Sequence, residues 1–173
     1  MHNIIGFIIA YFIFVIVHEG MHILMAIPFN EYQSFVFKLI GPEVIFKTPI
    51  GEREGLKWSF ISGVPNIITL IIGYILYYFR EILNQTPKPL KSLLFYLTVF
   101  FLLFDAFNLS LGPFIYGGDI VGISIGLGIN QIIIQFVFFI LLVINREIII
   151  QKIFPVYQVK TKHFLFRPLI KSK

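Results

Sequence analysis

The sequence contains no cysteine among its 173 residues. This absence excludes disulfides and thiolate metal sites, and it leaves His, Asp and Glu as the side chains that could bind a metal. Charge is also scarce, since 13% of the residues are charged, whereas an ordinary soluble domain carries roughly 25%. In contrast, 57% of the residues are hydrophobic and the mean hydropathy is +0.87. This length and composition predict one domain surrounded by a membrane.

Long apolar runs account for most of the chain. A helix needs roughly 20 apolar residues to cross the hydrocarbon core of a bilayer. Four runs meet this requirement, over residues 4–27, 58–79, 90–111 and 120–144. Because hydrocarbon offers the backbone no other hydrogen-bond partner, we predict an all-α membrane protein with four transmembrane helices.

The longest connection between these runs covers residues 28–57. Two stretches rich in β-branched and aromatic residues flank Gly41-Pro42 within it, which predicts a short β-hairpin over residues 32–48. Small residues gather in the fourth run and predict close helix packing there. They are Gly122, Ser124, Gly126 and Gly128.

Positive charge is unevenly distributed along the chain. The net charge is +5, and seven of the 14 Lys and Arg residues lie within residues 146–173. We therefore predict one polytopic membrane domain over residues 1–145, followed by a basic tail that lies on an anionic bilayer surface. Four spans put both termini on the side that carries this tail, so the positive-inside rule favours cytoplasmic termini. No base-reading motif accompanies the tail, so no nucleic-acid partner is expected, and no oligomeric state follows from the sequence.

Two histidines and a glutamate interrupt the first apolar run, in His18-Glu19-Gly20-Met21-His22. Residues four apart lie on the same face of a helix, so the two imidazoles can reach one Zn²⁺. Glu19 is rotated by roughly 100° and can approach a metal-bound water without becoming a ligand. This is the H-E-x-x-H pattern, in which the Glu is the general base. Ionisable groups at membrane depth are costly, which favours this functional interpretation over polar side chains that pack between helices.

A third ligand is expected from one of the two aspartates, Asp105 and Asp119. Asp119 lies at the start of the fourth run, on the side of the membrane where the first run ends. Its depth in the membrane therefore matches that of His18 and His22, which lie in the second half of the first run. The preceding Gly117-Gly118 gives the backbone freedom to present a carboxylate. We therefore favour Asp119 and keep Asp105 as the alternative. The other role for Asp105 is to orient a ligand histidine.

Three segments together resemble the site-2 protease family of intramembrane zinc metalloproteases. Residues 18–22 match the zinc-binding helix of the family, and residues 62–66 (SGVPN) are similar to its Gly-Pro-x-x-Asn element. Residues 108–113 (NLSLGP), with the Gly-Gly-Asp at 117–119, are similar to the Asn-x-x-Pro and Asp-Gly stretch that supplies the third ligand. This sequence differs from the family pattern at this point: Gly117-Gly118 precedes Asp119 and Ile120 follows it, whereas the family usually has Gly after the Asp. The resemblance extends over residues 14–145. It implies a divergent or minimal member of the site-2 protease family.

This resemblance implies a zinc metalloendopeptidase that hydrolyses peptide bonds of membrane proteins or peptides. His18, His22 and Asp119 would hold the zinc and leave a fourth position for water. Glu19 would take a proton from that water and then protonate the leaving amine. Asn108 would donate to the substrate backbone or to an oxyanion, or it would instead pack between helices. The expected hairpin would offer an edge to an extended substrate, or it would be an ordinary interfacial loop.

Two other functions remain open for the sequence. One is a catalytically silent metal-binding membrane protein, such as a pseudoprotease that binds a partner. The other is a small ion-transport subunit whose His and Asp side chains line an ion path. An ion path has no need of a Glu between two helical ligands, so the sequence favours the protease.

Overall fold

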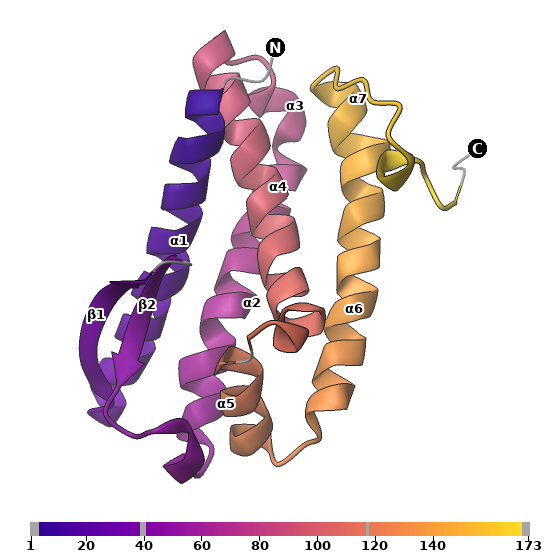
Figure 1. Cartoon of the computed structure of the whole chain (residues 1–173). Helices are drawn as coiled ribbons and strands as arrows, with labels where there is room; N and C mark the ends of the chain where they lie inside the picture. Colours follow the sequence, from indigo (N-terminus) through magenta and orange to yellow (C-terminus); the bar gives the residue numbers. More distant parts are fainter. Residues whose placement is uncertain (1–3, 39–40, 117, 171–173) are drawn as a thin grey trace.

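The computed structural model describes residues 4–38, 41–116 and 118–170, and it is a bundle of long helices with a hairpin on one side (Figure 1). The elements in chain order are α1 (Ile4–Ala26), β1 (Tyr32–Lys38), β2 (Gly41–Phe46), α2 (Lys57–Tyr78), α3 (Arg80–Leu83), α4 (Lys88–Ser110), α5 (Gly118–Leu127), α6 (Gln131–Ile148) and α7 (Phe154–Val156). Short 3-10 turns follow α1 at Ile27–Phe29 and precede α2 at Ile50–Glu52. A π turn at Ile149–Ile153 joins α6 to α7.

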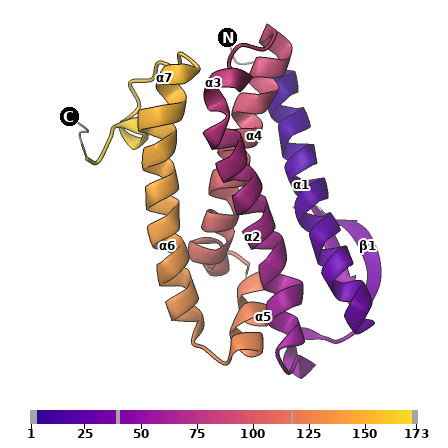
Figure 2. The same cartoon turned by 180° about the vertical axis from the view of Figure 1, so that it is seen from behind.

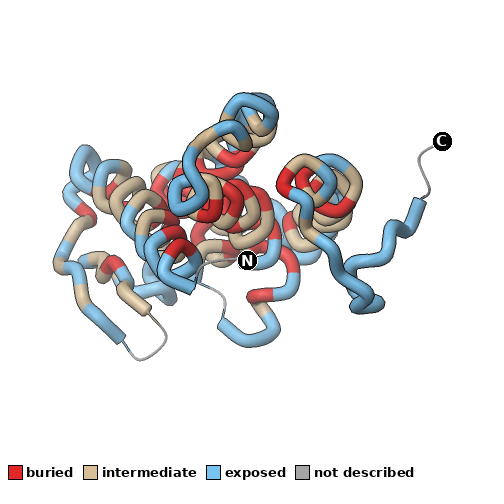
Figure 3. The backbone as a smooth tube through the Cα atoms, turned by 90° about the horizontal axis from the view of Figure 1, so that it is seen from above, coloured by how far each residue is buried: buried red, intermediate tan, exposed pale blue. Residues whose placement is uncertain are grey.

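Within the described residues, four helices are long and apolar enough to cross a membrane. They are Ile4–Phe29, Lys57–Tyr78, Lys88–Ser110 and Gln131–Val156. The view along the bundle shows buried positions turned toward neighbouring helices and exposed positions turned outward (Figure 3). The outward faces carry large apolar side chains such as Ile16, Ile71 and Phe136. The predicted all-α architecture with four such helices and a small hairpin is therefore confirmed.

The fourth predicted span, over residues 120–144, has the wrong bounds. Residues 118–127 form the separate helix α5, and the spanning helix begins only at Gln131. Gly128 ends α5 with a left-handed backbone (φ +65°), and Asn130 caps α6 by accepting a hydrogen bond from the Ile132 N–H (2.9 Å). Helical structure then continues past residue 144 to Val156, so it crosses the expected domain boundary at 145.

Helix α5 lies side by side with the first part of α2 in both views of the bundle (Figures 1 and 2). A Cβ atom on Gly122 would overlap the side chain of Ser62, and one on Gly126 would overlap the backbone of Ser59. Glycine at these two positions therefore lets the helix axes approach closely, as predicted from the small residues. Gly128 differs, because it serves the end of α5.

The hairpin predicted between residues 32 and 48 is confirmed, with β1 and β2 antiparallel and Phe35 paired with Val44. Gly41 and Pro42 belong to β2 itself, and the residues just before them lie outside the described part of the chain. The hairpin packs on α1 through β2, where Val44 is buried. This contact places the hairpin beside the second half of α1, where the two histidines lie (Figure 1).

Candidate metal centre

His18 and His22 lie on the buried face of α1. The buried residues of this helix are Gly6, Ala10, Phe14, His18, His22 and Ala26, each four residues after the last. A period of four keeps one face of a helix in contact with its neighbours. The ring of Phe14 stacks on that of His18, with centroids 5.8 Å apart. The two histidines therefore occupy consecutive places in a stripe that packs against the rest of the bundle.

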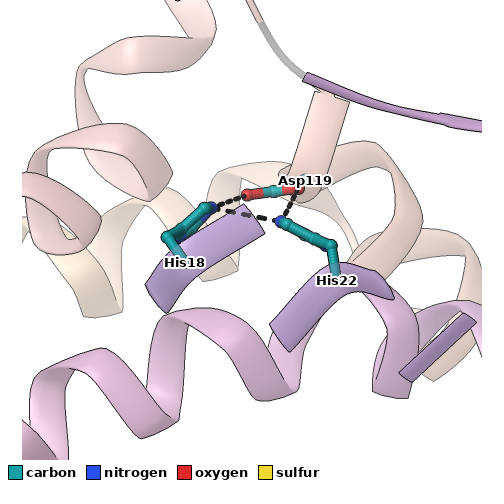
Figure 4. Close-up of side chains that lie close together, drawn as sticks. All are labelled: His18, His22 and Asp119. Carbon is teal, nitrogen blue, oxygen red and sulfur yellow. Dashed lines mark hydrogen bonds and ion pairs between the residues drawn. The ribbon is translucent and has the colours of Figure 1, made fainter. Parts of the chain in front are cut away.

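The carboxylate of Asp119, on the first turn of α5, meets both imidazoles (Figure 4). His22 Nε2 lies 3.3 Å from Asp119 Oδ1, and His18 Nε2 lies 3.5 Å from Asp119 Oδ2. The two Nε2 atoms are 3.1 Å apart. Sequence reasoning placed these three side chains together, and the structure brings them within 4.8 Å of one another.

The second nitrogen of each histidine has its own partner. His22 Nδ1 lies 2.9 Å from the carbonyl oxygen of Ile61, and His18 Nδ1 lies 3.0 Å from Asp105 Oδ1. The Ile61 carbonyl oxygen accepts, so His22 Nδ1 donates to it, whereas the contact between His18 Nδ1 and Asp105 is an ion pair. The buried Asp105 thus lies behind His18, and it also accepts a hydrogen bond from the Thr69 hydroxyl. Of the two roles considered for Asp105, the geometry matches the orientation of a histidine.

Two amides hold the carboxylate of Asp119. Asn108 Nδ2 donates to Asp119 Oδ2 at 3.0 Å, and Asn66 Nδ2 donates to the same oxygen at 3.2 Å. The sequence predicted that the Asn108 amide contacts substrate. In this structure the amide instead donates to Asp119 and so helps to position that carboxylate. Asn66 was not predicted as a site residue. The sequence signal was an amide inside an apolar run, because such a group needs a polar partner once it is buried.

The spacing of the cluster suits a tetrahedral Zn²⁺. Ligand atoms at about 2.0–2.1 Å from a tetrahedral metal lie roughly 3.3 Å from one another. The distances among His18 Nε2, His22 Nε2 and the Asp119 oxygens are 3.1, 3.3 and 3.5 Å. These distances join two imidazole nitrogens and both oxygens of one carboxylate, and a cation between such groups would stabilise them. The three residues are therefore a donor set that could hold a zinc ion.

A cavity of about 810 Å³ opens over the cluster. Its wall includes the two histidines, Asp119 and Glu19, and it continues along the hairpin and the loop up to Arg53. Glu19 Oε2 accepts a hydrogen bond from the Val44 N–H of β2 at 3.1 Å. Glu19 thus lies on the wall of the same cavity as the candidate ligand atoms and is not one of them.

Comparison with protein-family models, with curated proteins and with solved structures gives no match in any of the three. The resemblance to the site-2 protease family stays a prediction. The observations that bear on function are the cluster of His18, His22 and Asp119, the neighbouring Glu19, and the cavity above them.

Proposed function

We propose that this chain is an intramembrane zinc metalloprotease that hydrolyses peptide bonds of membrane-associated proteins or peptides. One observation carries the proposal: the ligand atoms of His18, His22 and Asp119 converge, and Glu19 lies on the wall of the same cavity. Two imidazoles, one carboxylate and an open position are the donor set of a catalytic zinc. The resemblance of residues 18–22 to the zinc-binding helix of the site-2 proteases supports the same function.

Each side chain of the centre has a role in this reaction. When bound, zinc supplies a Lewis acid that makes water more acidic and polarises a peptide carbonyl. Asp105 and the Ile61 carbonyl hold the two histidines in the tautomer that presents Nε2. Glu19 takes the proton of the attacking water and passes it to the leaving amine. The Val44 N–H holds Oε2 of Glu19, while Oε1 has no hydrogen-bond partner among the described residues and is available for water.

The cavity offers a route to the centre for water and peptide. Its wall combines residues of α1 and α4, which lie within membrane-length helices, with hairpin and loop residues outside them. Hydrolysis at membrane depth needs such a connection, because hydrocarbon holds almost no water. A peptide that enters along the hairpin passes β2 before it meets Glu19. We propose that the β2 edge holds such a peptide in an extended form.

We further propose that all four long helices cross the bilayer and that both termini face the cytoplasm. The start of α1 and the end of α7 lie at the same end of the bundle (Figure 1). The connection between α2 and α4 lies there too, and it contributes Arg80 and Lys88 to the basic side. The basic residues of the tail join them, which favours the cytoplasmic face.

The test of the proposal compares Glu19→Gln with the wild-type chain. Both proteins, purified in detergent and loaded with zinc, are incubated with tagged peptides that each contain one apolar span, and the products are read by mass spectrometry. We expect cleavage by wild type and a loss of at least about 100-fold in Glu19→Gln, since general-base catalysis contributes 10²–10⁴-fold. Zinc content should be equal in the two proteins. Equal cleavage by both, or none by either, would contradict a protease.

The absence of cleavage from a chain that still binds zinc would favour the silent metal-binding protein. An ion-transport subunit is less consistent with the geometry. An ion path distributes its ligands along a route, whereas these ligand atoms lie within 4.8 Å of one another. Zinc flux into liposomes that contain the wild-type protein would be the result that favours transport.

A further inference from the structure

Arg53 lies on the wall of the cavity that holds the metal centre, in the loop just after the turn Ile50–Glu52. Its guanidinium carbon is 4.2 Å from the centre of the Trp58 ring and 5.1 Å from that of Phe46. The two rings meet edge to face, and Trp58 is fully buried. Stacking against two aromatic rings restricts the planar guanidinium to a narrow range of orientations.

The hydrogen-bond donors of Arg53 are largely unused. Its Nε donates to the Thr48 carbonyl at 3.4 Å, and no acceptor for Nη1 or Nη2 is found among residues 4–38, 41–116 and 118–170. The other cation on the cavity wall, Lys38, forms an ion pair with Glu43 at 2.5 Å. Arg53 therefore brings to the cavity a preorganised cation whose terminal donors are free to bind an anion.

The surroundings of Arg53 raise the cost of leaving this charge unpaired. Burial lowers the pKa of Arg53, and the charges of Asp119 and Glu31 oppose that effect from a distance. A guanidinium stays protonated throughout the physiological range. A half-buried guanidinium that stacks on two rings and has two free Nη groups matches the two oxygens of a carboxylate, which it can bind through paired N–H···O bonds.

We propose that Arg53 is a carboxylate-binding subsite of this cavity, which recognises a carboxylate of the peptide that the metal centre receives. This inference rests on the proposed function, because it takes the ligand to be a peptide. The carboxylate belongs either to the C-terminus of the peptide or to a Glu or Asp side chain near the scissile bond. Binding at Arg53 fixes the position of the chain relative to Glu19 and the metal, and it selects acidic substrates over neutral ones.

A simpler role for Arg53 is to clamp the loop onto Trp58 and Phe46 by cation–π stacking alone. The two roles predict different results for one substitution. A clamp that is lost in Arg53→Gln loosens the loop and weakens every ligand of the cavity equally. A carboxylate subsite that is lost weakens acidic ligands and leaves neutral ligands unchanged.

The experiment measures binding of three fluorescent apolar decapeptides to the full-length, zinc-loaded Glu19→Gln protein, in which turnover is expected to be at least about 100-fold slower. The first peptide has a free C-terminal carboxylate, the second is its amide, and the third is the amide with one internal glutamate. Fluorescence anisotropy in detergent gives the dissociation constants. We expect the first or the third peptide to bind about tenfold or more tightly than the neutral amide. The peptide that gains affinity identifies the source of the carboxylate.

Arg53→Gln in the same background should abolish the preference, and Arg53→Lys should keep part of it, because an ammonium lacks the planar pair of donors. Arg80→Gln is the matched control, since Arg80 also stacks on an aromatic ring (Tyr77, 4.6 Å) but lies outside the cavity wall. It should retain the full preference. Thermal unfolding and zinc content verify that each variant is folded.

Three results would overturn the inference: equal or undetectable binding of all three peptides to the chain with Arg53, a preference that survives Arg53→Gln, or an equal loss for acidic and neutral peptides in Arg53→Gln. If only the inference about Arg53 is wrong, the wild-type chain still binds zinc and still cleaves neutral peptides. If the proposed function is wrong, the wild-type chain cleaves no peptide.

Discussion

The two aspartates near the histidines contact different atoms of the imidazoles. Asp119 faces Nε2 of both rings, whereas Asp105 faces Nδ1 of His18 alone. Asp119→Asn should therefore remove a zinc ligand and abolish stoichiometric binding. Asp105→Asn should keep the ligand set but lower zinc affinity by about 10–100-fold, as the loss of an orienting partner does. Competition with a zinc chelator measures both affinities, and a larger loss in Asp105→Asn than in Asp119→Asn would reverse the two roles.

A second residue-level prediction concerns Glu31, which anchors the loop that carries the hairpin. The buried carboxylate accepts from Lys57 Nζ (2.6 Å) and from the Thr48 N–H (3.2 Å). Burial alone would raise the pKa of Glu31, but these hydrogen bonds and the charge of Lys57 outweigh it and lower the pKa. Because the pKa is lower in the folded state, the stabilisation is present above the unfolded value of about 4.3 and is lost as the pH falls through the folded value.

Glu31→Gln should accordingly lower the free energy of unfolding at pH 7 by about 1–2 kcal/mol. The difference from wild type should shrink as the pH falls below about 4, where the wild-type carboxylate becomes protonated. Thermal unfolding in detergent at several pH values measures this. A difference that stays constant from pH 7 to pH 3.5 would show that the charge of Glu31 does not stabilise the loop.

Among the helices, α5 determines where the Asp119 carboxylate lies. Its close approach to α2 depends on Gly122, where an added Cβ would overlap Ser62. Gly122→Ala should force the helices apart at a cost of about 1–3 kcal/mol, and it should weaken zinc binding because Asp119 lies one turn away on α5. Gly118→Ala is the matched control, since its added Cβ would meet nothing within 4 Å. Chelator competition should show unchanged zinc affinity in the control, and equal losses in both variants would contradict this role of the helix contact.

How far the elements could be predicted depends on the range of the interactions that determine them. The apolar runs and the spacing of His18, Glu19 and His22 are local patterns, so the long helices and the shared face of the histidines were predictable. The break around Gly128 was missed because an apolar run continues on both sides of it. The positions of Asp105 behind His18 and of Arg53 on the cavity wall depend on packing between distant segments, which no local pattern encodes.

For the molecule as a whole, the account predicts the sides on which its loops lie. The absence of cysteine makes single-cysteine labelling clean. A cysteine placed at the exposed positions Gln85 or His163 should react with a membrane-impermeant maleimide only after intact cells are opened. One placed at the exposed Glu54 should react on intact cells, because the proposed orientation puts the hairpin side outside the cell. If all three cysteines react from the same side of the membrane, the proposal that the four long helices cross the bilayer is contradicted.

The most direct test of the metal centre is zinc X-ray absorption spectroscopy of the purified protein loaded with one equivalent of zinc. The account predicts a shell of nitrogen and oxygen atoms at about 2.0–2.2 Å, with the outer-shell scattering of two imidazoles. Asp119→Asn should lose the two-imidazole shell, because it abolishes stoichiometric binding, whereas Asp105→Asn should leave the composition of the shell intact. A shell with fewer than two imidazoles, or one that is identical in wild type and Asp119→Asn, would contradict a zinc site formed by His18, His22 and Asp119.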